Sequence, residues 1–354
     1  MMHRRTLLTG LALAPFAQLL GADLRARIRI AQIGTSHAHA AGKMDSLRSL
    51  TDLYDVVGFA EPIASQQVAA QKSKSFVGLK TLTEEEILAD RSIQAVVIET
   101  TLEDSARAAL AALKAGKHIH LDKPGAEKHA DYVTLRRYAA EQKLTVQMGY
   151  MLRYNPGIQL LVQAVKEGWL GEVMEIDASM GKLLDEESRK RFALLPGGGM
   201  YELACHLVDT IVTLMGPPTA VQAFGNATRA PSDPFVDNQL AILTYPKATV
   251  TIRCNHTDPF GGPHRYITVR GTHGDMEIRP LESGKGILRL NQARSDGRFK
   301  KGENAFELQV PKGRYDEEFR DLHRVLLGGQ AFAWSAEHDI AVHATALRAG
   351  GLTP

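Results

Sequence analysis

Two stretches of the sequence hold ionisable side chains in patterns that suit acid–base chemistry. In "HIHLDKPGA", Lys123 follows an apolar run that predicts a parallel strand, and ligands of parallel sheets gather at the carboxyl ends of the strands. In "PGGGMYELACHLVDTIVTLMGPP", Glu202, His206 and Asp209 stand at positions i, i+4 and i+7. This spacing predicts that they share one helix face, where the two carboxylates orient and charge-stabilise the imidazole.

Each pattern also has an ordinary explanation. Lys123 could be one more surface lysine, but its place directly before Pro124 favours a fixed side chain, because proline restricts the backbone. Partial burial would lower its pKa and let it bind a substrate hydroxyl or exchange that group's proton. The ionisable stripe could equally be a solvated helix face. Cys205 is interpreted as a packed thiol, since no base is placed to activate it.

A third stretch, "IRIAQIGTSHAHAAGK", begins like a dinucleotide-binding turn and then departs from it. Such a turn uses three glycines, for the bend, for the approach of the pyrophosphate and for helix–strand contact. Gly34 keeps the first glycine, whereas Ser36 and His39 replace the other two. Ser36 can donate to a phosphate and the helix N-terminus attracts an anion, but His39 is bulky for its position. Glu61 ends the next strand, where a carboxylate either accepts both ribose hydroxyls and favours NAD over NADP, or is simply solvated.

The composition limits the other classes of function. The 354-residue chain has 44% hydrophobic and 23% charged residues and a formal net charge of +2, as in an ordinary globular protein, and it has no basic block for nucleic acid. Cys205 and Cys254 lack metal-site spacing and cannot form a disulfide framework. His37 and His39 are two possible ligands without a nearby carboxylate or cysteine, so we expect no metal.

The elements that must position these residues fall into two groups. In residues 27–150, apolar runs alternate with helical patterns, which predicts a doubly wound parallel sheet. From residue 151 the rhythm changes to the helical patterns "NPGIQLLVQAVKEGWLG" and "MYELACHLVDTIVTLM", followed by alternating strand patterns. Residues 151–354 are therefore predicted to form an α+β domain with an open, mainly antiparallel sheet that is covered on one face.

Residues 1–26 differ from the rest of the chain. Arg4 and Arg5 precede an apolar run that is too short and too interrupted for a comfortable membrane span. The pattern is typical of a twin-arginine signal peptide, whose route exports proteins already folded around their cofactor. We expect a periplasmic or secreted protein with no membrane span in the mature chain. If these residues are instead an uncleaved anchor or a tail, the expected location is the cytoplasm.

Three stretches together resemble the Gfo/Idh/MocA oxidoreductase family, in the same order and with similar separations. They are "GKHIHLDKP", "GYMLRYNPGIQLLVQAVKEGWLGEV" and "GGGMYELACHLVDTIVTLMG". The resemblance extends from about residue 28 to the C-terminus. It implies an N-terminal Rossmann domain that binds the nicotinamide cofactor, followed by an α/β domain that binds substrate and forms homo-oligomers through its sheet.

The resemblance also implies roles for particular residues near the first domain. The family's Glu-Lys-Pro motif corresponds to Asp122, Lys123 and Pro124, and its lysine binds substrate and takes part in catalysis. Arg153, in "MLRYNP", matches an arginine near the cofactor or substrate. The family's stretch Thr-Pro-x-x-x-His appears here as "TTLEDS", with Thr101 in place of the proline. The cofactor side is therefore altered more than the proton-transfer side.

In the second domain the resemblance covers the proton-transfer residues. The family's Asp-x-x-x-His motif falls on Glu202 and His206, and Asp209 matches a further family aspartate. In family members this histidine commonly exchanges the hydroxyl proton while hydride passes to nicotinamide. Glu202 is one methylene longer than the family's aspartate, which changes its reach only slightly.

Together these observations predict an NAD-dependent oxidoreductase acting on a sugar, cyclitol or related polyhydroxy compound. Lys123 would hold the reacting hydroxyl, His206 would accept its proton, and the Glu202 and Asp209 carboxylates would orient the imidazole. The residues expected along the cofactor are Gly34, Thr35, Ser36, His37, Glu61, Thr100, Asp122, Lys123 and Arg153. Two alternatives stay open: an NAD-retaining glycosidase or lyase with transient oxidation, and a non-catalytic sugar-binding protein of the same fold.

Overall fold

The structure, a computed structural model, describes residues 26–354, so the predicted signal peptide lies outside the described residues except for Ala26. Apolar runs in the first half of the chain form a parallel sheet, because strands covered on both faces need apolar side chains throughout. These strands are β1 (Ile28–Ile33), β2 (Tyr54–Ala60), β3 (Ala95–Ile98), β4 (His118–Leu121) and β5 (Val146–Met148).

The order of this sheet is β2-β1-β3-β4-β5, which confirms the doubly wound arrangement. Its helices are α1 (Ala40–Ser49), α2 (Ala64–Lys72), α3 (Glu84–Ala89), α4 (Leu102–Lys114) and α5 (His129–Glu141). The strand order reverses beside β1, so a crevice opens at the carboxyl ends of β1 and β3. Thr83 and Glu86 form a reciprocal capping box at the start of α3.

The second half of the chain builds one large sheet and the helices that cover it. Its strands are β6 (Val173–Gly181), β7 (Ala220–Asn226), β8 (Asn238–Thr244), β9 (Thr249–Asn255), β10 (Tyr266–Gly271), β11 (Gly274–Ile278), β12 (Lys285–Leu290) and β13 (Gly302–Glu307). The order is β13-β12-β11-β10-β6-β9-β8-β7, and β6–β9 is the one parallel pair of this second sheet within the described residues. The predicted open, mainly antiparallel sheet is therefore confirmed.

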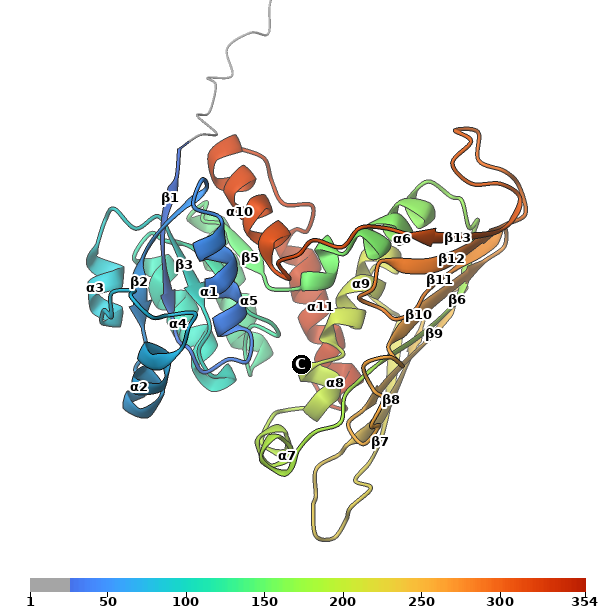
Figure 1. The fold of residues 1–354 in the computed structure, drawn as a ribbon. Helices are drawn as coiled ribbons and strands as arrows, with labels where there is room; N and C mark the ends of the chain where they lie inside the picture. The colour runs from blue at the N-terminus through green and yellow to red at the C-terminus, as the bar shows by residue number, and fades with distance from the viewer. Residues whose placement is uncertain (1–25) are drawn as a thin grey trace, which may run out of the picture.

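The helical elements of this half are η1 (Met151–Tyr154), α6 (Pro156–Lys166), α7 (Glu186–Ala193), α8 (Gly198–Glu202), α9 (Cys205–Met215), α10 (Asp316–Gly328) and α11 (Ala336–Ala349). Figure 1 shows α6, α9 and α11 between the large sheet and the Rossmann half. Alternate sheet residues such as Ala241, Leu243, Val250 and Ile252 are fully buried under them, and the other face of the sheet is open. Within residues 26–354, no helix is both long and apolar enough to cross a membrane.

The last two helices return to the Rossmann half rather than staying with the large sheet (Figure 1). The Tyr54 hydroxyl donates to the Phe319 carbonyl of α10 at 2.6 Å, and His129 of α5 lies 3.0 Å from His343 of α11 between their Nδ1 atoms. The predicted boundary near residue 150 therefore marks a change along the chain, but α10 and α11, which follow it, pack against the Rossmann half.

One predicted element is corrected by the structure. The pattern "MYELACHLVDTIVTLM" predicts a continuous helix, but α8 ends at Glu202 and α9 begins at Cys205. At the break, the Glu202 carbonyl accepts hydrogen bonds from the Lys123 ammonium at 2.6 Å and from the Cys205 thiol at 3.3 Å. A contact from another domain thus uses a backbone acceptor that a continuous helix would need for itself. The elements α7 and β13 are additions that the sequence patterns did not predict.

Candidate active site

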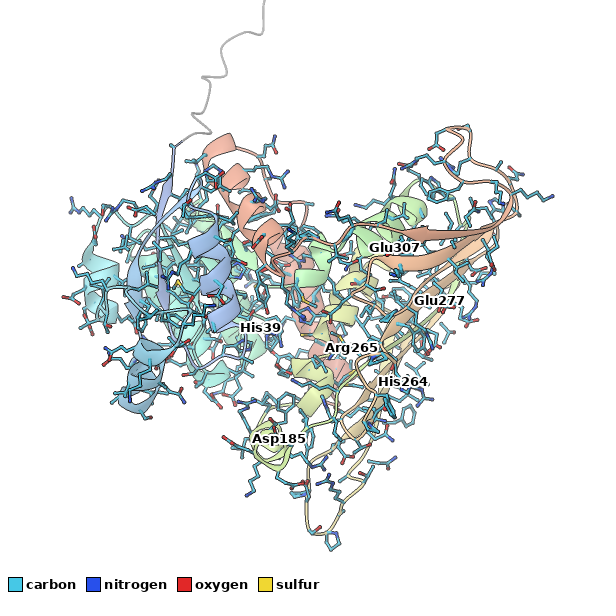
Figure 2. The ribbon with its side chains drawn as sticks, in the orientation of Figure 1. His39, Asp185, His264, Arg265, Glu277 and Glu307 are labelled. Atoms are coloured by element: carbon cyan, nitrogen blue, oxygen red, sulfur yellow. The ribbon has the colours of Figure 1, made fainter. Side chains whose placement is uncertain are left out.

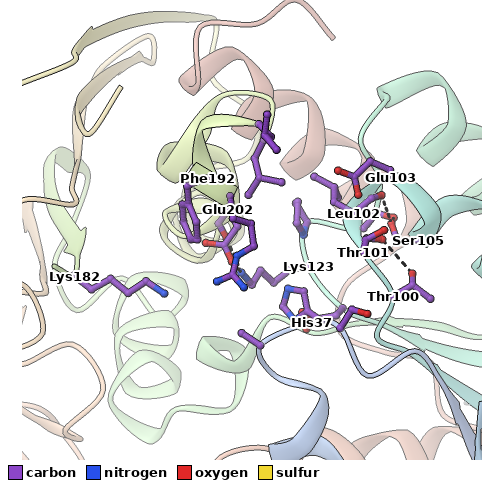
Figure 3. A pocket seen from close by; sticks show the side chains of 18 residues that line it. His37, Thr100, Thr101, Leu102, Glu103, Ser105, Lys123, Lys182, Phe192 and Glu202 are labelled. Carbon is purple, nitrogen blue, oxygen red and sulfur yellow. Dashed lines mark hydrogen bonds and ion pairs between the residues drawn. The ribbon is translucent and has the colours of Figure 1, made fainter. Parts of the chain in front are cut away.

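A cavity lies where the carboxyl ends of β3 and β4 face the helices of the second half (Figure 3). The Rossmann side contributes the turn after β1, the segment between β3 and α4, and the residues after β4. The second half contributes the residue after β6, the end of α7 and the end of α8. Its lining includes the polar, charged and aromatic residues Ser36, His37, Thr100, Thr101, Glu103, Asp122, Lys123, Lys182, Arg191, Phe192 and Glu202.

Lys123 and Glu202 form a buried ion pair in this cavity. The Lys123 ammonium lies 2.6 Å from Glu202 Oε1, and the lysine is only 2% exposed. Burial opposes the charge on Lys123, but Glu202 outweighs burial and raises the lysine pKa. The lysine in turn holds the pKa of Glu202 well below its usual range, against the effect of burial. The expectation that Lys123 has a lowered pKa is therefore wrong, and the side chain is a fixed cation.

His206 is a neutral imidazole beside this pair. It stands in the first turn of α9, is 2% exposed, and its Nδ1 is buried without a hydrogen-bond partner. Burial lowers its pKa well below 6.5, and the charge of Lys123 lowers it further. The ring meets Tyr150 edge-on at 5.9 Å between centroids. His206 does not itself line the cavity, but it lies near enough to Lys123 for the lysine charge to lower its pKa.

Asp209 has a different role from the one predicted. Its carboxylate binds Arg153, with 2.6 Å between Oδ1 and Nη2, and also lies 3.2 Å from His338. Arg153 reaches Asp339 of α11 at 2.6 Å as well and is only 6% exposed. This buried network ties η1, α9 and α11 together. Arg153 is therefore placed outside the cavity, and its predicted contact with cofactor stays a prediction.

The prediction that two carboxylates flank His206 is wrong for a geometric reason. The interruption after α8 removes Glu202 from the helix that carries His206, and Glu202 turns to Lys123 instead. Asp209 does share α9 with His206, but its oxygens bind Arg153 and His338. Sequence spacing could not reveal these partners, because they come from other elements.

The turn after β1 is shaped by Gly34 and Glu61. Gly34 has φ +90°, and an added Cβ would lie 2.5 Å from the Glu99 carbonyl carbon, so only glycine lets the turn approach β3. Glu61 is 4% exposed and accepts from the Thr35 N–H at 2.6 Å and the Ile63 N–H at 2.9 Å. In this structure Glu61 organises the turn. Its contact with ribose hydroxyls stays a prediction.

A buried charge network joins the turn to the ends of β3 and β4. Lys43 of α1 is fully buried and contacts both Glu99, at 2.9 Å, and Asp122. His37 Nδ1 lies 2.6 Å from Asp122 Oδ2, and His39 Nδ1 lies 3.2 Å from the same oxygen. Burial opposes the charge on His37, but Asp122 and Glu99 outweigh it and raise the pKa to about 9. The sequence analysis did not identify Lys43. It could have been found as a charged residue on the helix face that also carries Ala40, Met44 and Leu47.

This network also corrects the statement that the two histidines lack a nearby carboxylate. The ligand atoms of His37, His39 and Asp122 lie within 4.8 Å of one another. Charge balance nevertheless needs no metal, because Lys43 and protonated His37 already face the carboxylates of Glu99 and Asp122. We therefore assign no metal to this cluster.

The cavity fits a nicotinamide cofactor on the grounds of its donors and its place in the sheet. It opens at the strand ends where doubly wound sheets bind dinucleotides, and the hydroxyl residues Ser36, Thr100 and Thr101 line it. His39, which replaces the glycine of helix–strand contact, turns to Asp122 and packs 5.7 Å from the Tyr315 ring. Its bulk is therefore accommodated between Asp122 and Tyr315. Gly34 and Thr35 form the turn but do not line the cavity.

Comparison with known proteins agrees with this architecture. The family described as "Oxidoreductase family, NAD-binding Rossmann fold" matches residues 28–150, and "GFO/IDH/MocA C-terminal domain" matches residues 158–277. The chain belongs to the Gfo/Idh/MocA oxidoreductase family. The resemblance inferred from the three sequence stretches is confirmed, and the chain is an enzyme of an NAD(P)-binding oxidoreductase family.

Two curated relatives are about a quarter identical to the chain over the aligned regions. An uncharacterized oxidoreductase of Schizosaccharomyces pombe is 26% identical over 270 residues, 73% of each chain. A scyllo-inositol 2-dehydrogenase (NADP(+)) of Bacillus subtilis is 26% identical over 186 residues, 52% of this chain and 51% of its own. The solved structure of levoglucosan dehydrogenase with NADH and levoglucosan has a TM-score of 0.79 at 17% identity, covering 92% of this chain and 98% of that one. That likeness establishes the fold.

Proposed function

We propose that this Gfo/Idh/MocA protein is an NAD-dependent oxidoreductase that oxidises or forms a hydroxyl-bearing carbon of a sugar, cyclitol or related polyhydroxy compound. The observation that carries the proposal is the pairing of a fixed cation, Lys123, with the nearby neutral imidazole of His206. Nicotinamide, when bound, supplies the hydride acceptor. Ser36, His37, Thr100 and Asp122 line the cavity that would hold it.

The side chains divide the work of alcohol oxidation between charge stabilisation and proton transfer. The Lys123 ammonium binds the substrate hydroxyl oxygen and stabilises the negative charge that develops there. We assign the hydroxyl proton to a ring nitrogen of His206, which does not line the cavity but lies close enough to Lys123 for the lysine charge to lower its pKa and help keep the ring neutral at pH 7. Glu202 is a positioning residue that fixes the lysine. The products are a carbonyl, reduced nicotinamide and a proton on His206.

NAD is preferred over NADP in this proposal because of Glu61. A carboxylate at the end of β2 repels a 2′-phosphate and suits a free ribose 2′-hydroxyl. The Bacillus subtilis relative carries NADP(+) in its name, so both cofactors belong in the assay. Isothermal titration of the full chain with NAD and with NADP measures the preference directly, and tighter binding of NADP would contradict it.

Two experiments test the proposed function. Protein purified without added cofactor is denatured, and the released nucleotide is identified by mass spectrometry. The same protein is then assayed for NADH formation with a panel of sugars and cyclitols, alongside Lys123→Met and His206→Asn. Absence of nucleotide together with absence of NAD binding would overturn the proposal. Cleavage of a glycoside without net NADH would favour the transient-oxidation alternative.

We propose that the chain is exported by the twin-arginine route. The support is the paired Arg4 and Arg5 ahead of an apolar run. Fractionation of cells expressing the full chain should recover it outside the cytoplasm, and Arg4→Lys with Arg5→Lys should retain it inside. Equal export of the wild type and the double variant would contradict this route.

We also propose that the protein self-associates through the open face of the large sheet. Phe224 on β7 is 54% exposed and pairs in register with Leu240 on β8. Leu240 faces away from the covering helices, because its neighbour Ala241 is buried against them. Light scattering should find an oligomer for the wild type and a smaller species for Phe224→Glu. A monomeric wild type would contradict the proposal.

A further inference from the structure

One wall of the cavity carries two cations that have no acidic partner. Lys182, directly after β6, and Arg191, in the last turn of α7, both line the cavity. Neither side chain makes a salt bridge to any residue in the described range 26–354. Unpaired cations on a concave wall create a positive potential that attracts anions.

No carboxylate of the cavity forms a salt bridge with Lys182 or Arg191 in the described residues, although the charge of Glu202 acts on Lys182 and raises its pKa. Glu202 is paired with Lys123, and Asp122 is held by the cations of the first turn and α1. Glu103 is a further carboxylate in the lining, and Figure 3 places it across the cavity from Lys182. The cavity is therefore polarised, with positive charge on the side of the second half.

Hydrogen bonds hold the backbone at Lys182, and both cations lie near Phe192, with the Arg191 side chain exposed. The Lys182 N–H donates to the Asn255 carbonyl at 3.1 Å, and the Lys182 carbonyl lies 3.2 Å from His256 Nδ1. Both cations then approach one ring: Lys182 Nζ lies 5.3 Å, and Arg191 Cζ 6.0 Å, from the Phe192 centroid. Burial lowers the pKa of Lys182 against the opposing charge of Glu202, and the charges of Lys123, Arg265 and Arg191 lower it further. An anion bound between Lys182 and Arg191 would offset the burial of the Lys182 charge and the repulsion between the two cations.

We propose that Lys182 and Arg191 form a subsite for an anionic group, a carboxylate or a phosphate, on the polyhydroxy substrate. The inference rests on the proposed function, since it names the class of compound that the same cavity takes: an acidic sugar or cyclitol. Arg191 supplies a planar fork for two oxygens and Lys182 a point charge. The reacting hydroxyl then faces Lys123, while the anionic group is held on the opposite wall from Glu103.

The test compares matched ligands by isothermal titration of the full chain with NAD present. Each set holds a neutral hexose, its uronate and its 6-phosphate, for the gluco, galacto and manno series. We expect one anionic form in at least one series to bind about tenfold tighter than its neutral partner, because an ion pair is added. The uronate and phosphate arms tell the two sources of the charge apart. This preference should weaken as salt is raised.

Variants locate the subsite. Lys182→Met and Arg191→Gln should each remove most of the preference, while Lys182→Arg should keep it. Lys190→Gln is the matched control, since Lys190 lies on α7 next to Arg191, is exposed and does not line the cavity. The proposal is wrong if neutral and anionic forms bind equally in every series, or if the preference survives in the double variant Lys182→Met with Arg191→Gln.

NADH formation, recorded in parallel, separates this inference from the proposed function. NADH formation from sugars whose neutral and anionic forms bind equally well, in the wild type and in the Lys182 and Arg191 variants, would overturn the anionic subsite and leave the oxidoreductase proposal standing. Anion binding that requires both residues, without NADH from any ligand, would overturn the oxidoreductase proposal and leave the subsite standing.

Discussion

At the scale of single residues, the chemistry of the site depends on which charges are paired. Lys123 is buried and Glu202 is half-buried, and each keeps the other ionised. His206 has an unpartnered Nδ1 and stays neutral. Pushing neighbouring pKa values apart assigns different tasks to groups in one site. Here the task of stabilising an oxyanion falls to the lysine and that of accepting a proton to the histidine.

Glu202→Gln tests the pairing of Lys123. The substitution leaves a buried ammonium without its counterion, so we expect kcat to fall about 100-fold as its orientation is lost. Unfolding in urea should show a stability loss of about 3 kcal/mol, the cost of breaking a buried pair. Glu187→Gln is the control, because Glu187 is exposed on α7 and does not line the cavity. Unchanged kcat in Glu202→Gln would rule out the positioning role.

The pH dependence of alcohol oxidation tests His206. Burial, followed by the charge of Lys123, lowers the pKa of His206 below 6.5, and only the neutral ring accepts a proton. We therefore expect kcat/KM to stay level as pH falls from 7 through 6.5 and to decline only in more acidic buffer. His206→Asn should lower kcat/KM and remove this decline. An inflection at or above pH 6.5 would show that another group, or a differently placed histidine, is the base.

At the scale of elements, the turn after β1 keeps one of the three usual glycines and is surrounded by buried charged side chains. Gly34 retains the one glycine that steric contact demands, and Lys43, from inside α1, ties the helix to the ends of β3 and β4. Strand positions were predictable because apolar runs record burial on both faces. The charge network was not, because Glu99 and Asp122 are distant from Lys43 in the chain.

Gly34→Ala tests how closely the turn must approach β3. An alanine there would combine φ +90° with a Cβ only 2.5 Å from Glu99 backbone, whereas Gly78 has φ +81° and nothing within 4 Å. Gly78→Ala should therefore cost about 1 kcal/mol of unfolding free energy from backbone strain alone. Gly34→Ala should cost at least about 2 kcal/mol more, because backbone must move. Equal costs in urea unfolding would show that the contact is unimportant.

The helix that carries His206 shows where element prediction reached its limit. Periodicity over residues 200–215 predicted helix correctly for α8 and α9, since local spacing reports the buried face. It did not report the break between them, where Lys123 takes the Glu202 carbonyl. The sequence therefore identified candidate site residues, but it assigned the wrong partners to Glu202 and Asp209.

At the scale of the whole molecule, α10 carries a buried carboxyl back to the Rossmann half. Glu318 is fully buried, both of its carboxyl oxygens lack hydrogen-bond partners, and His120 of β4 lies 3.6 Å away. The Glu318 carbonyl accepts from the Gln147 side chain of β5 at 2.8 Å. Burial raises the pKa of Glu318 to about 8, so the carboxyl is protonated in the folded protein at neutral pH.

Glu318→Gln tests whether this buried carboxyl makes the stability of the fold depend on pH. The folded pKa lies above the unfolded value of 4.5, so the folded state holds the proton more tightly. The resulting stabilisation is complete below pH 4.5 and is lost as pH rises through about 8, by at least about 1 kcal/mol. Urea unfolding from pH 5 to 8 should be less pH-dependent in Glu318→Gln than in the wild type. Glu317→Gln, on the same helix and 42% exposed, should match the wild type.

The sequence by itself determined the strands, most helices, the family and the residue types of the site, because periodicity and short motifs depend on neighbours in the chain. Only the tertiary structure decided that Glu202 binds Lys123, that Asp209 binds Arg153, and that Lys182 and Arg191 are left without partners. The physical reason is that ion pairing depends on distances of a few ångströms between side chains from separate elements, and burial then multiplies the effect of each pair on pKa.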